Sequence, residues 1–181
     1  MSSKLKSENN MNTRFVTVWP SPDEAMREEA VAFWQAEGAI TDPAKARERA
    51  LELLVVARNE SGRIVAVTTA RRRRIEPLGL DCYYLRMFVG RAARSLELAG
   101  PLLHQAYLAL YAHVREGLEP GVAGVYLEIE NRKFQKVIRE AVWTWRDMSF
   151  VYLGRNPRGD HLRVCYFPGA RLPEEEPGPA G

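Results

Sequence analysis

The chain has 181 residues, of which 46% are hydrophobic and 27% charged, and its formal net charge is +3. These values fit one globular domain with its own core, and so small a charge gives no reason to expect nucleic acid as a partner. No apolar run is long enough for a membrane helix and the N-terminus lacks the apolar core of a signal peptide, so we expect a cytoplasmic protein without a membrane partner.

Both ends of the chain have the composition of tails. Residues 1–13 are rich in Ser, Lys and Asn, and residues 169–181 are rich in Pro and Gly and carry an acidic run. Such segments bury too little apolar surface to offset the entropy lost on ordering. We therefore predict two disordered tails and one folded domain over residues 14–168.

The domain begins with an alternating, β-branched stretch over 14–19, which predicts a strand. Ser21-Pro22-Asp23-Glu24 then predicts a helix start, with Ser21 as the cap and Glu24 completing a capping box. Gly38 ends this helix. Asp42-Pro43 opens a second helix.

Three strands follow, at 53–58, 64–69 and 82–89, and the turn at 59–62 makes the first two a hairpin. The run Arg71-Arg72-Arg73-Arg74 lies beyond the second of them. It is either a rim for an acidic ligand or RNA, or a solvated strand end that discourages edge pairing. We favour the second interpretation, because RNA binding usually adds exposed aromatic residues and the run contains none.

The second half of the domain starts with a long amphipathic helix after Arg94. Its apolar stripe consists of Leu96, Ala99, Leu103, Ala106, Leu110 and Val114. A strand over 125–129 follows, and Asn131 caps a fourth helix with the stripe Phe134, Val137, Ile138, Ala141 and Val142. Two strands at 150–153 and 162–167 close the chain as a hairpin. The order predicts an α/β (α+β) fold with a mixed sheet of about seven strands and about four helices.

The junction between the strand at 82–89 and the long helix carries the clearest chemical signal. The strand breaks at Gly90 into a short loop with Arg91 and Arg94, and the helix starts directly after it. Such a junction gathers unpaired backbone N–H groups and guanidinium charge, which suit a phosphate or pyrophosphate. An ordinary turn with solvated arginines is the alternative.

With this loop in the middle, the order of elements resembles the GNAT N-acetyltransferase superfamily over nearly all of the folded region. The family signature is Arg/Gln-x-x-Gly-x-Gly/Ala followed by a leucine pair. Here Arg94-Ser95-Leu96-Glu97-Leu98-Ala99 stands in its place, and Leu102-Leu103 supplies the pair. Glu97 replaces the first glycine. Asn131 matches the family's asparagine after the fifth strand.

The resemblance implies an N-acyltransferase that uses acetyl-CoA as co-substrate, with no metal, and acetylates a primary amine of an acceptor that the sequence does not identify. It implies cofactor contacts from Met87, Phe88 and Val89 on the fourth strand. Further cofactor contacts would come from Arg91, Arg94, Ala99 and Asn131. A monomer and a homodimer both stay open.

The resemblance also implies a general base on the fifth strand, for which Glu128 and Glu130 are the candidates; solvated or structural carboxylates are the alternative for both. The family's acid is often a tyrosine in the fourth helix, and this helix contains none. Because Glu97 also departs from the signature, a second hypothesis is a GNAT-fold protein that has lost acetyl-CoA catalysis. It would act as a ligand-binding or protein-interaction module.

Overall fold

The structure is a computed structural model that describes residues 13–94 and 96–172. Most of the two predicted tails, residues 1–12 and 173–181, lies outside this range, and so does Ser95 of the motif. In the described range, no helix is both long enough and apolar enough to cross a membrane.

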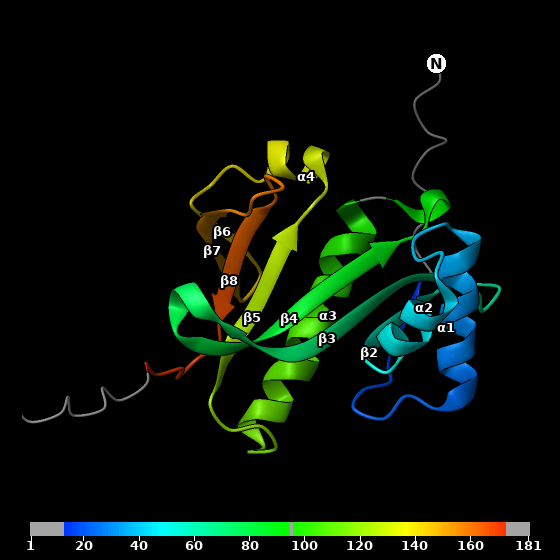
Figure 1. Ribbon diagram of the computed structural model, residues 1–181, viewed down its shortest axis with the longest axis horizontal. Helices are drawn as coiled ribbons and strands as arrows, with labels where there is room; N and C mark the ends of the chain where they lie inside the picture. Colours follow the sequence, from blue (N-terminus) through cyan, green and yellow to red (C-terminus); the bar gives the residue numbers. More distant parts are fainter. Residues whose placement is uncertain (1–12, 95, 173–181) are drawn as a thin grey trace, which may run out of the picture. The chain divides into compact units, whose positions relative to one another are not determined.

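Within residues 13–94 and 96–172, eight strands form one mixed sheet in the order β1-β2-β3-β4-β5-β8-β7-β6, and four α-helices accompany it. Figure 1 follows the chain through these elements. The chain divides into two compact units, each described below by itself. The first unit contains the residues up to Ala70 together with Leu85–Leu110, and the second contains Arg71–Tyr84 and the residues from Tyr111 onward. The sheet has one strand more than the seven predicted.

In the first unit, two helices pack on a small antiparallel sheet. The strands are β1 (Arg14–Thr17), β2 (Leu53–Arg58) and the start of β3 (Ile64–Ile75), and the helices are α1 (Glu24–Ala36) and α2 (Pro43–Ala50). Their shared core consists of Ala30, Val31, Trp34, Ala46, Ala50, Leu53, Val56, Ile64 and Val67. Small alanines on the inner helix faces let the helices lie close to the strands.

The start of α1 corrects one detail of the sequence analysis. The N-cap is Asp23, whose Oδ1 accepts a hydrogen bond from the Met26 N–H at 2.7 Å, and not Ser21. Ser21 and Asp23 are both good caps, and the sequence alone did not separate them. The second predicted cap is confirmed, because Asp42 accepts from the Ala44 N–H at 2.9 Å.

Two long strands pass through both units. β3 continues to Ile75, so the four arginines lie inside this strand and not beyond it, and β4 spans Leu80–Val89. A short 3-10 turn, η1 (Glu76–Leu78), joins them. After η2 (Arg91–Ala93), α3 spans Leu96–Arg115, and the predicted stripe is buried at Ala99, Leu103, Ala106 and Leu110.

In the second unit, the strands β5 (Val122–Ile129), β8 (His161–Tyr166), β7 (Met148–Arg155) and β6 (Val142–Trp145) are antiparallel neighbours in that order. β5 and β8 approach closely at Gly124, where a Cβ would lie 2.2 Å from the Cys165 carbonyl oxygen. Only glycine fits this contact. Cys82 and Cys165 are buried and unpaired, as expected, and burial raises the pKa of the Cys82 thiol to about 11.

The fourth helix is shorter than predicted. α4 spans only Arg132–Val137, and Val142 begins β6. The sequence Val142-Trp143-Thr144-Trp145 favours a strand, which pairs with β7 through a two-residue turn at Arg146-Asp147. The predicted stripe is therefore wrong at its end: Val137 and Val142 are 61% and 51% exposed.

A buried arginine supports this change of structure. The Arg163 guanidinium is 1% exposed and donates to the carbonyl oxygens of Ile138 at 3.2 Å and Glu140 at 2.8 Å. It also donates to the Phe150 carbonyl oxygen at 3.1 Å. The bonds to Ile138 and Glu140 satisfy carbonyl groups that a continued helix would pair internally.

Candidate functional site

The predicted cofactor residues of the first unit lie on the last residues of β4 and on the loop after it. Arg94 is exposed at the end of this loop, and its Nε donates to the Val89 carbonyl oxygen at 3.2 Å. Its guanidinium lies 5.9 Å from the centre of the Phe88 ring, which packs edge-on against Phe33. The exposed guanidinium of Arg94 is therefore held against the end of β4 by Val89 and Phe88.

Arg91 is bound to the end of α1. Its backbone N–H donates to Glu37 Oε2 at 2.9 Å, and its Nη2 donates to the Glu37 carbonyl oxygen at 3.0 Å. The loop is also tied to β3, because the Gly90 N–H donates to the Val65 carbonyl oxygen at 2.8 Å. These contacts fix the start of Gly90–Arg94, the loop for which the sequence predicts phosphate binding and which we call the phosphate loop.

The first turn of α3 carries the motif positions. Glu97, the residue in place of the first signature glycine, is exposed on this turn, where a carboxylate is favoured by the helix dipole. Ala99 is 5% exposed, and Leu102 and Leu103 are buried as well. The small residue and the leucine pair thus lie in the core, and Met87 on β4 is 37% exposed.

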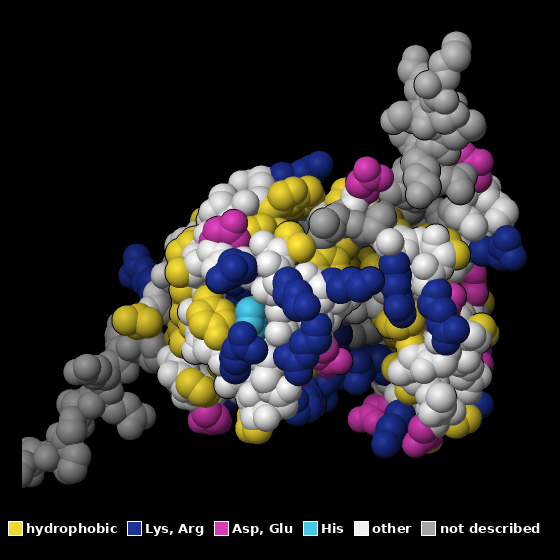
Figure 2. Space-filling model, turned by 90° about the horizontal axis from the view of Figure 1, so that it is seen from above, with side chains coloured by type: hydrophobic (Ala, Val, Ile, Leu, Met, Phe, Trp, Pro, Cys, Tyr) yellow, Lys and Arg dark blue, Asp and Glu magenta, His cyan; other side chains and the backbone are white. Residues whose placement is uncertain are grey.

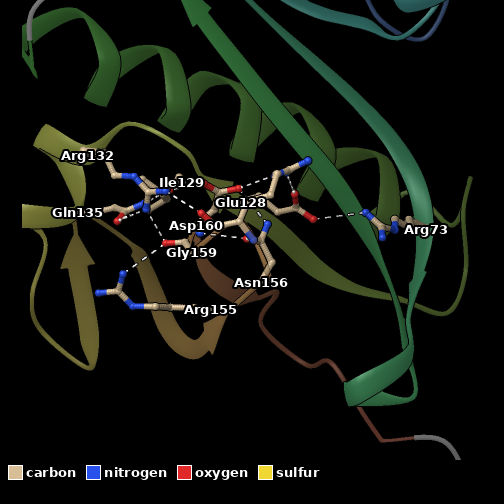
Figure 3. Close-up of polar contacts among 10 residues, drawn as sticks. Arg73, Glu128, Ile129, Arg132, Gln135, Arg155, Asn156, Gly159 and Asp160 are labelled. Atoms are coloured by element: carbon tan, nitrogen blue, oxygen red, sulfur yellow. Dashed lines mark hydrogen bonds and ion pairs between the residues drawn. The ribbon is translucent and has the colours of Figure 1, made fainter.

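The predicted bases lie in the second unit, at the end of β5. The Glu128 side chain is 11% exposed, and both its oxygens are engaged. Oε1 lies 3.5 Å from Arg73 Nη1, and Oε2 accepts from Arg158 Nη2 at 3.0 Å, as Figure 3 shows. The two contacts tie the Glu128 carboxylate to Arg73 and Arg158.

Glu130 and Asn131 follow β5 directly and are both exposed. The Asn131 side chain caps α4 as predicted, since Oδ1 accepts from the Lys133 N–H at 2.9 Å. The strand end is held by Gln135, which is 7% exposed and whose Nε2 donates to the Ile129 carbonyl oxygen at 2.7 Å. Glu130 thus stands on a fixed backbone with an exposed carboxylate.

The turn between β7 and β8 is clamped from α4. Arg132 donates from Nη1 to the Gly159 carbonyl oxygen at 2.6 Å and from Nη2 to the Arg158 carbonyl oxygen at 2.7 Å (Figure 3). Asp160 is 4% exposed, and hydrogen bonds from Asn156 and Arg158 lower the pKa of its carboxyl. We call the side chains of Glu128, Arg132, Arg158 and Asp160 the turn network. Figure 2 shows Lys and Arg side chains on the surface of the molecule.

The arginines of β3 make internal contacts. Arg72 donates to Asp81 Oδ2 from Nε at 2.9 Å and from Nη2 at 2.6 Å, and this bond lowers the pKa of the Asp81 carboxyl. Arg74 lies 3.5 Å from Asp81, and Arg73 lies over the Tyr84 ring. The run is exposed, as expected of solvated arginines, but it lies inside β3, so its interpretation as a strand end is wrong.

Three residues that stabilise the phosphate loop or the β7–β8 turn give no such signal in the sequence. Glu37 reads only as part of a helix, and Arg158 and Asp160 read only as parts of a turn. The Arg158–Glu128 bond joins residues that are 30 positions apart in the chain, and the Arg91–Glu37 bond joins residues that are 54 positions apart. The one local signal was the composition of the turn at 156–160, where Asn and Asp side chains commonly bond the nearby backbone.

Comparison with solved structures shows the fold. The chain resembles the GNAT family N-acetyltransferase YhbS of Escherichia coli in complex with CoA, at a TM-score of 0.53 and 14% identity, over 86% of this chain and 80% of that one. It resembles NAA60 of Arabidopsis thaliana in complex with a bisubstrate analogue at a TM-score of 0.53 and 12% identity, over 87% and 100% of the two chains.

A third similar structure is a Corynebacterium glutamicum protein described as histone acetyltransferase HPA2 and related acetyltransferase. Its TM-score is 0.51 at 19% identity, over 91% of this chain and 99% of that one. No family model and no curated protein matches the sequence. At these identities the similarity establishes the architecture and not the chemistry. The chain has the fold of the GNAT N-acetyltransferases.

Proposed function

We propose that the protein is an acetyl-CoA-dependent N-acyltransferase that acetylates a primary amine. The observation that carries the proposal is the phosphate loop: on a GNAT fold, β4 ends in a short loop with the exposed arginines Arg91 and Arg94 directly before α3. Guanidinium groups beside a helix start suit a diphosphate. Similar structures contain CoA or acetyl-CoA.

In this proposal the chain needs little covalent chemistry of its own. Arg91, Arg94 and the first turn of α3 bind the diphosphate, and Ala99 keeps that turn close to the core. The backbone of Met87, Phe88 and Val89 orients the pantetheine arm, with Asn131 completing the cofactor contacts. Acetyl-CoA supplies the activated acetyl group. A carboxylate at the end of β5, Glu128 or Glu130, accepts the proton that the acceptor amine loses.

The direct test is calorimetric binding of CoA and acetyl-CoA, paired with thermal unfolding. A ligand present at one hundred times its dissociation constant stabilises the folded state by about 2.7 kcal/mol. Release of free thiol from acetyl-CoA in the presence of a panel of primary amines then tests transfer. Arg47→Ala, an exposed arginine on α2, is the matched control for changes in the loop. An absence of binding to both ligands would contradict the proposal.

A second candidate is a GNAT-fold protein that binds a ligand or partner and transfers no acetyl group. The specific observation in its favour is Glu128, whose oxygens are both engaged by guanidinium groups. The thiol-release assay separates the two candidates, because only the enzyme consumes acetyl-CoA.

A further inference from the structure

Glu37, at the end of α1, holds both the backbone and the side chain of Arg91. Its Oε2 accepts the Arg91 backbone N–H at 2.9 Å and lies 3.9 Å from Arg91 Nε. Its carbonyl oxygen accepts Arg91 Nη2 at 3.0 Å. The Arg91 side chain is nevertheless 73% exposed, so the guanidinium remains within reach of a ligand.

The Glu37 carboxylate also lies against the backbone of the phosphate loop. A Cβ added to Gly90 would lie 3.1 Å from Glu37 Oε1, while Oε2 accepts the next N–H along the chain. One oxygen therefore faces Gly90 and the other binds Arg91. A backbone N–H together with a guanidinium is the donor pair that a phosphate oxygen uses.

The local sequence gives no reason for an acid at this position. Glu37 is the C-cap of α1, and the last turn of this helix contains no basic residue. A negative charge at a helix C-terminus is unfavourable, because the helix dipole is negative there. A residue that conflicts with its own helix and is compensated by a distant loop indicates a role in that loop.

We propose that Glu37 sets the affinity of the phosphate loop, because its carboxylate competes with the CoA diphosphate for the backbone N–H and guanidinium of Arg91. This inference rests on the proposed function, since it takes CoA as the source of the phosphate. While the Glu37 carboxylate binds the Arg91 backbone N–H, a diphosphate can reach only the exposed Arg91 guanidinium, Arg94 and the first turn of α3. It has to displace the carboxylate before it gains the backbone N–H of Arg91.

The test compares Glu37→Gln and Glu37→Ala with the wild-type chain by calorimetry, using CoA and inorganic pyrophosphate as separate probes. Glu37→Gln removes the charge and keeps a neutral acceptor, and Glu37→Ala also frees the N–H. We expect both variants to bind both probes roughly two- to fivefold more tightly, the effect of removing one nearby exposed charge. Glu60→Gln, in the exposed β2–β3 turn, controls for the change in net charge, and circular dichroism controls for folding.

The same comparison in the Arg91→Ala variant tests whether Glu37 acts through Arg91. The gain in affinity from Glu37→Gln should be smaller there, because only the backbone N–H of residue 91 remains to be released. Tight CoA binding by the wild type without any gain in the Glu37 variants would overturn the inference and leave the proposed function standing. Weaker binding in the variants would also overturn the inference, and would mean that Glu37 holds the loop in its binding conformation. A gain for pyrophosphate in a chain that does not bind CoA would overturn the proposed function and the assignment of CoA as the ligand, and would leave only a competition between Glu37 and phosphate. No binding of either probe by any variant would overturn both the inference and the proposed function.

Discussion

Glu128 on β5 and Arg158 in the β7–β8 turn are joined by a hydrogen bond from Nη2 to Oε2 at 3.0 Å, and the same guanidinium donates from Nε to Asp160 Oδ2 at 3.0 Å. Glu128 thereby connects the end of a strand to a turn 30 residues further along the chain. The carboxylate predicted to be a base is thus part of a structural network. This arrangement separates the roles of Glu128 and Glu130.

We expect Glu130 to act as the base and Glu128 to position the turn. Glu130→Gln should lower kcat for acetyl transfer by roughly a hundredfold or more, the usual contribution of a general base. Glu128→Gln and Arg158→Ala should both produce smaller losses, because each weakens the Glu128–Arg158 bond and leaves Glu130 in place. If Glu128 were the base, Arg158→Ala would free its carboxylate and leave kcat unchanged or higher. Steady-state thiol release by the three variants distinguishes these outcomes.

Arg132 is expected to stabilise the turn through its two bonds to backbone carbonyl oxygens. Arg132→Ala should lower the free energy of unfolding by about 1 to 2 kcal/mol, less than for fully buried charged hydrogen bonds because the side chain is 55% exposed. Urea unfolding measures this loss. Lys133→Ala, an exposed neighbour on α4, serves as the control and should change the free energy little. Equal losses in the two variants would mean that the bonds contribute nothing specific.

Arg94 is expected to contribute most to CoA binding. Arg94→Ala should weaken it by roughly one to two orders of magnitude, since a charged hydrogen bond to phosphate contributes about 1.5–3 kcal/mol. Arg91→Ala should cost less, because Glu37 already holds its guanidinium. Calorimetry with CoA measures both changes. An unchanged affinity for CoA in both variants would mean that the loop is an ordinary turn and no phosphate site.

The sequence predicted the elements that depend on local pattern and missed those that depend on distant partners. The caps at Asp42 and Asn131 follow from spacing within a few residues, and the structure confirms them. The apolar stripe of α3 has the same local origin, and it is confirmed at Ala99, Leu103, Ala106 and Leu110. The end of α4 does not follow from local spacing. Arg163 donates hydrogen bonds to the carbonyl oxygens beyond this end, and it lies more than twenty residues further along the chain. The apolar period at 134–142 is visible in the sequence. The Arg163 guanidinium, which stabilises the non-helical backbone after Val137, has no signal there.

The same distinction applies to the candidate site. The strand–loop–helix junction at Arg91 and Arg94 is visible in the sequence, because it consists of neighbouring residues. Nothing local indicates that Glu37 binds Arg91 or that Arg158 binds Glu128. Single charged residues of this kind occur throughout solvated surfaces, and only the fold decides which of them meet.

His161, at the start of β8, is expected to make the protein sensitive to mild acid. Its side chain is 8% exposed and packs edge-on against the Tyr152 ring, and neither ring nitrogen has a hydrogen-bond partner among residues 13–94 and 96–172. Burial lowers the pKa of His161, and the nearby charges of Arg155, Arg163 and Arg132 lower it further. The folded chain therefore binds this proton less readily than the unfolded chain.

The sign of the effect follows from that difference. Above the unfolded value of about 6.5 the imidazole is neutral in both states, so it makes no pH-dependent contribution to the free energy of unfolding. As the pH falls through 6.5, the unfolded chain takes up a proton and the folded chain does not, so the free energy of unfolding decreases until the folded pKa is reached. The lowered pKa of Asp160 acts at lower pH, below the ordinary carboxyl value of 3.8, and leaves this window to His161.

Urea unfolding at pH 7.5 and 5.5, with an NMR titration of the His161 ring, measures the effect. His161→Phe should remove most of the loss between these two pH values. It should be no less stable than the wild type at pH 7.5, because it also removes two buried nitrogens without partners. A His161 ring that titrates at or above 6.5 would contradict the prediction. It would show that the ring finds an acceptor in solution, for which the carboxylate of the neighbouring Asp160 is the nearest acid in the sequence.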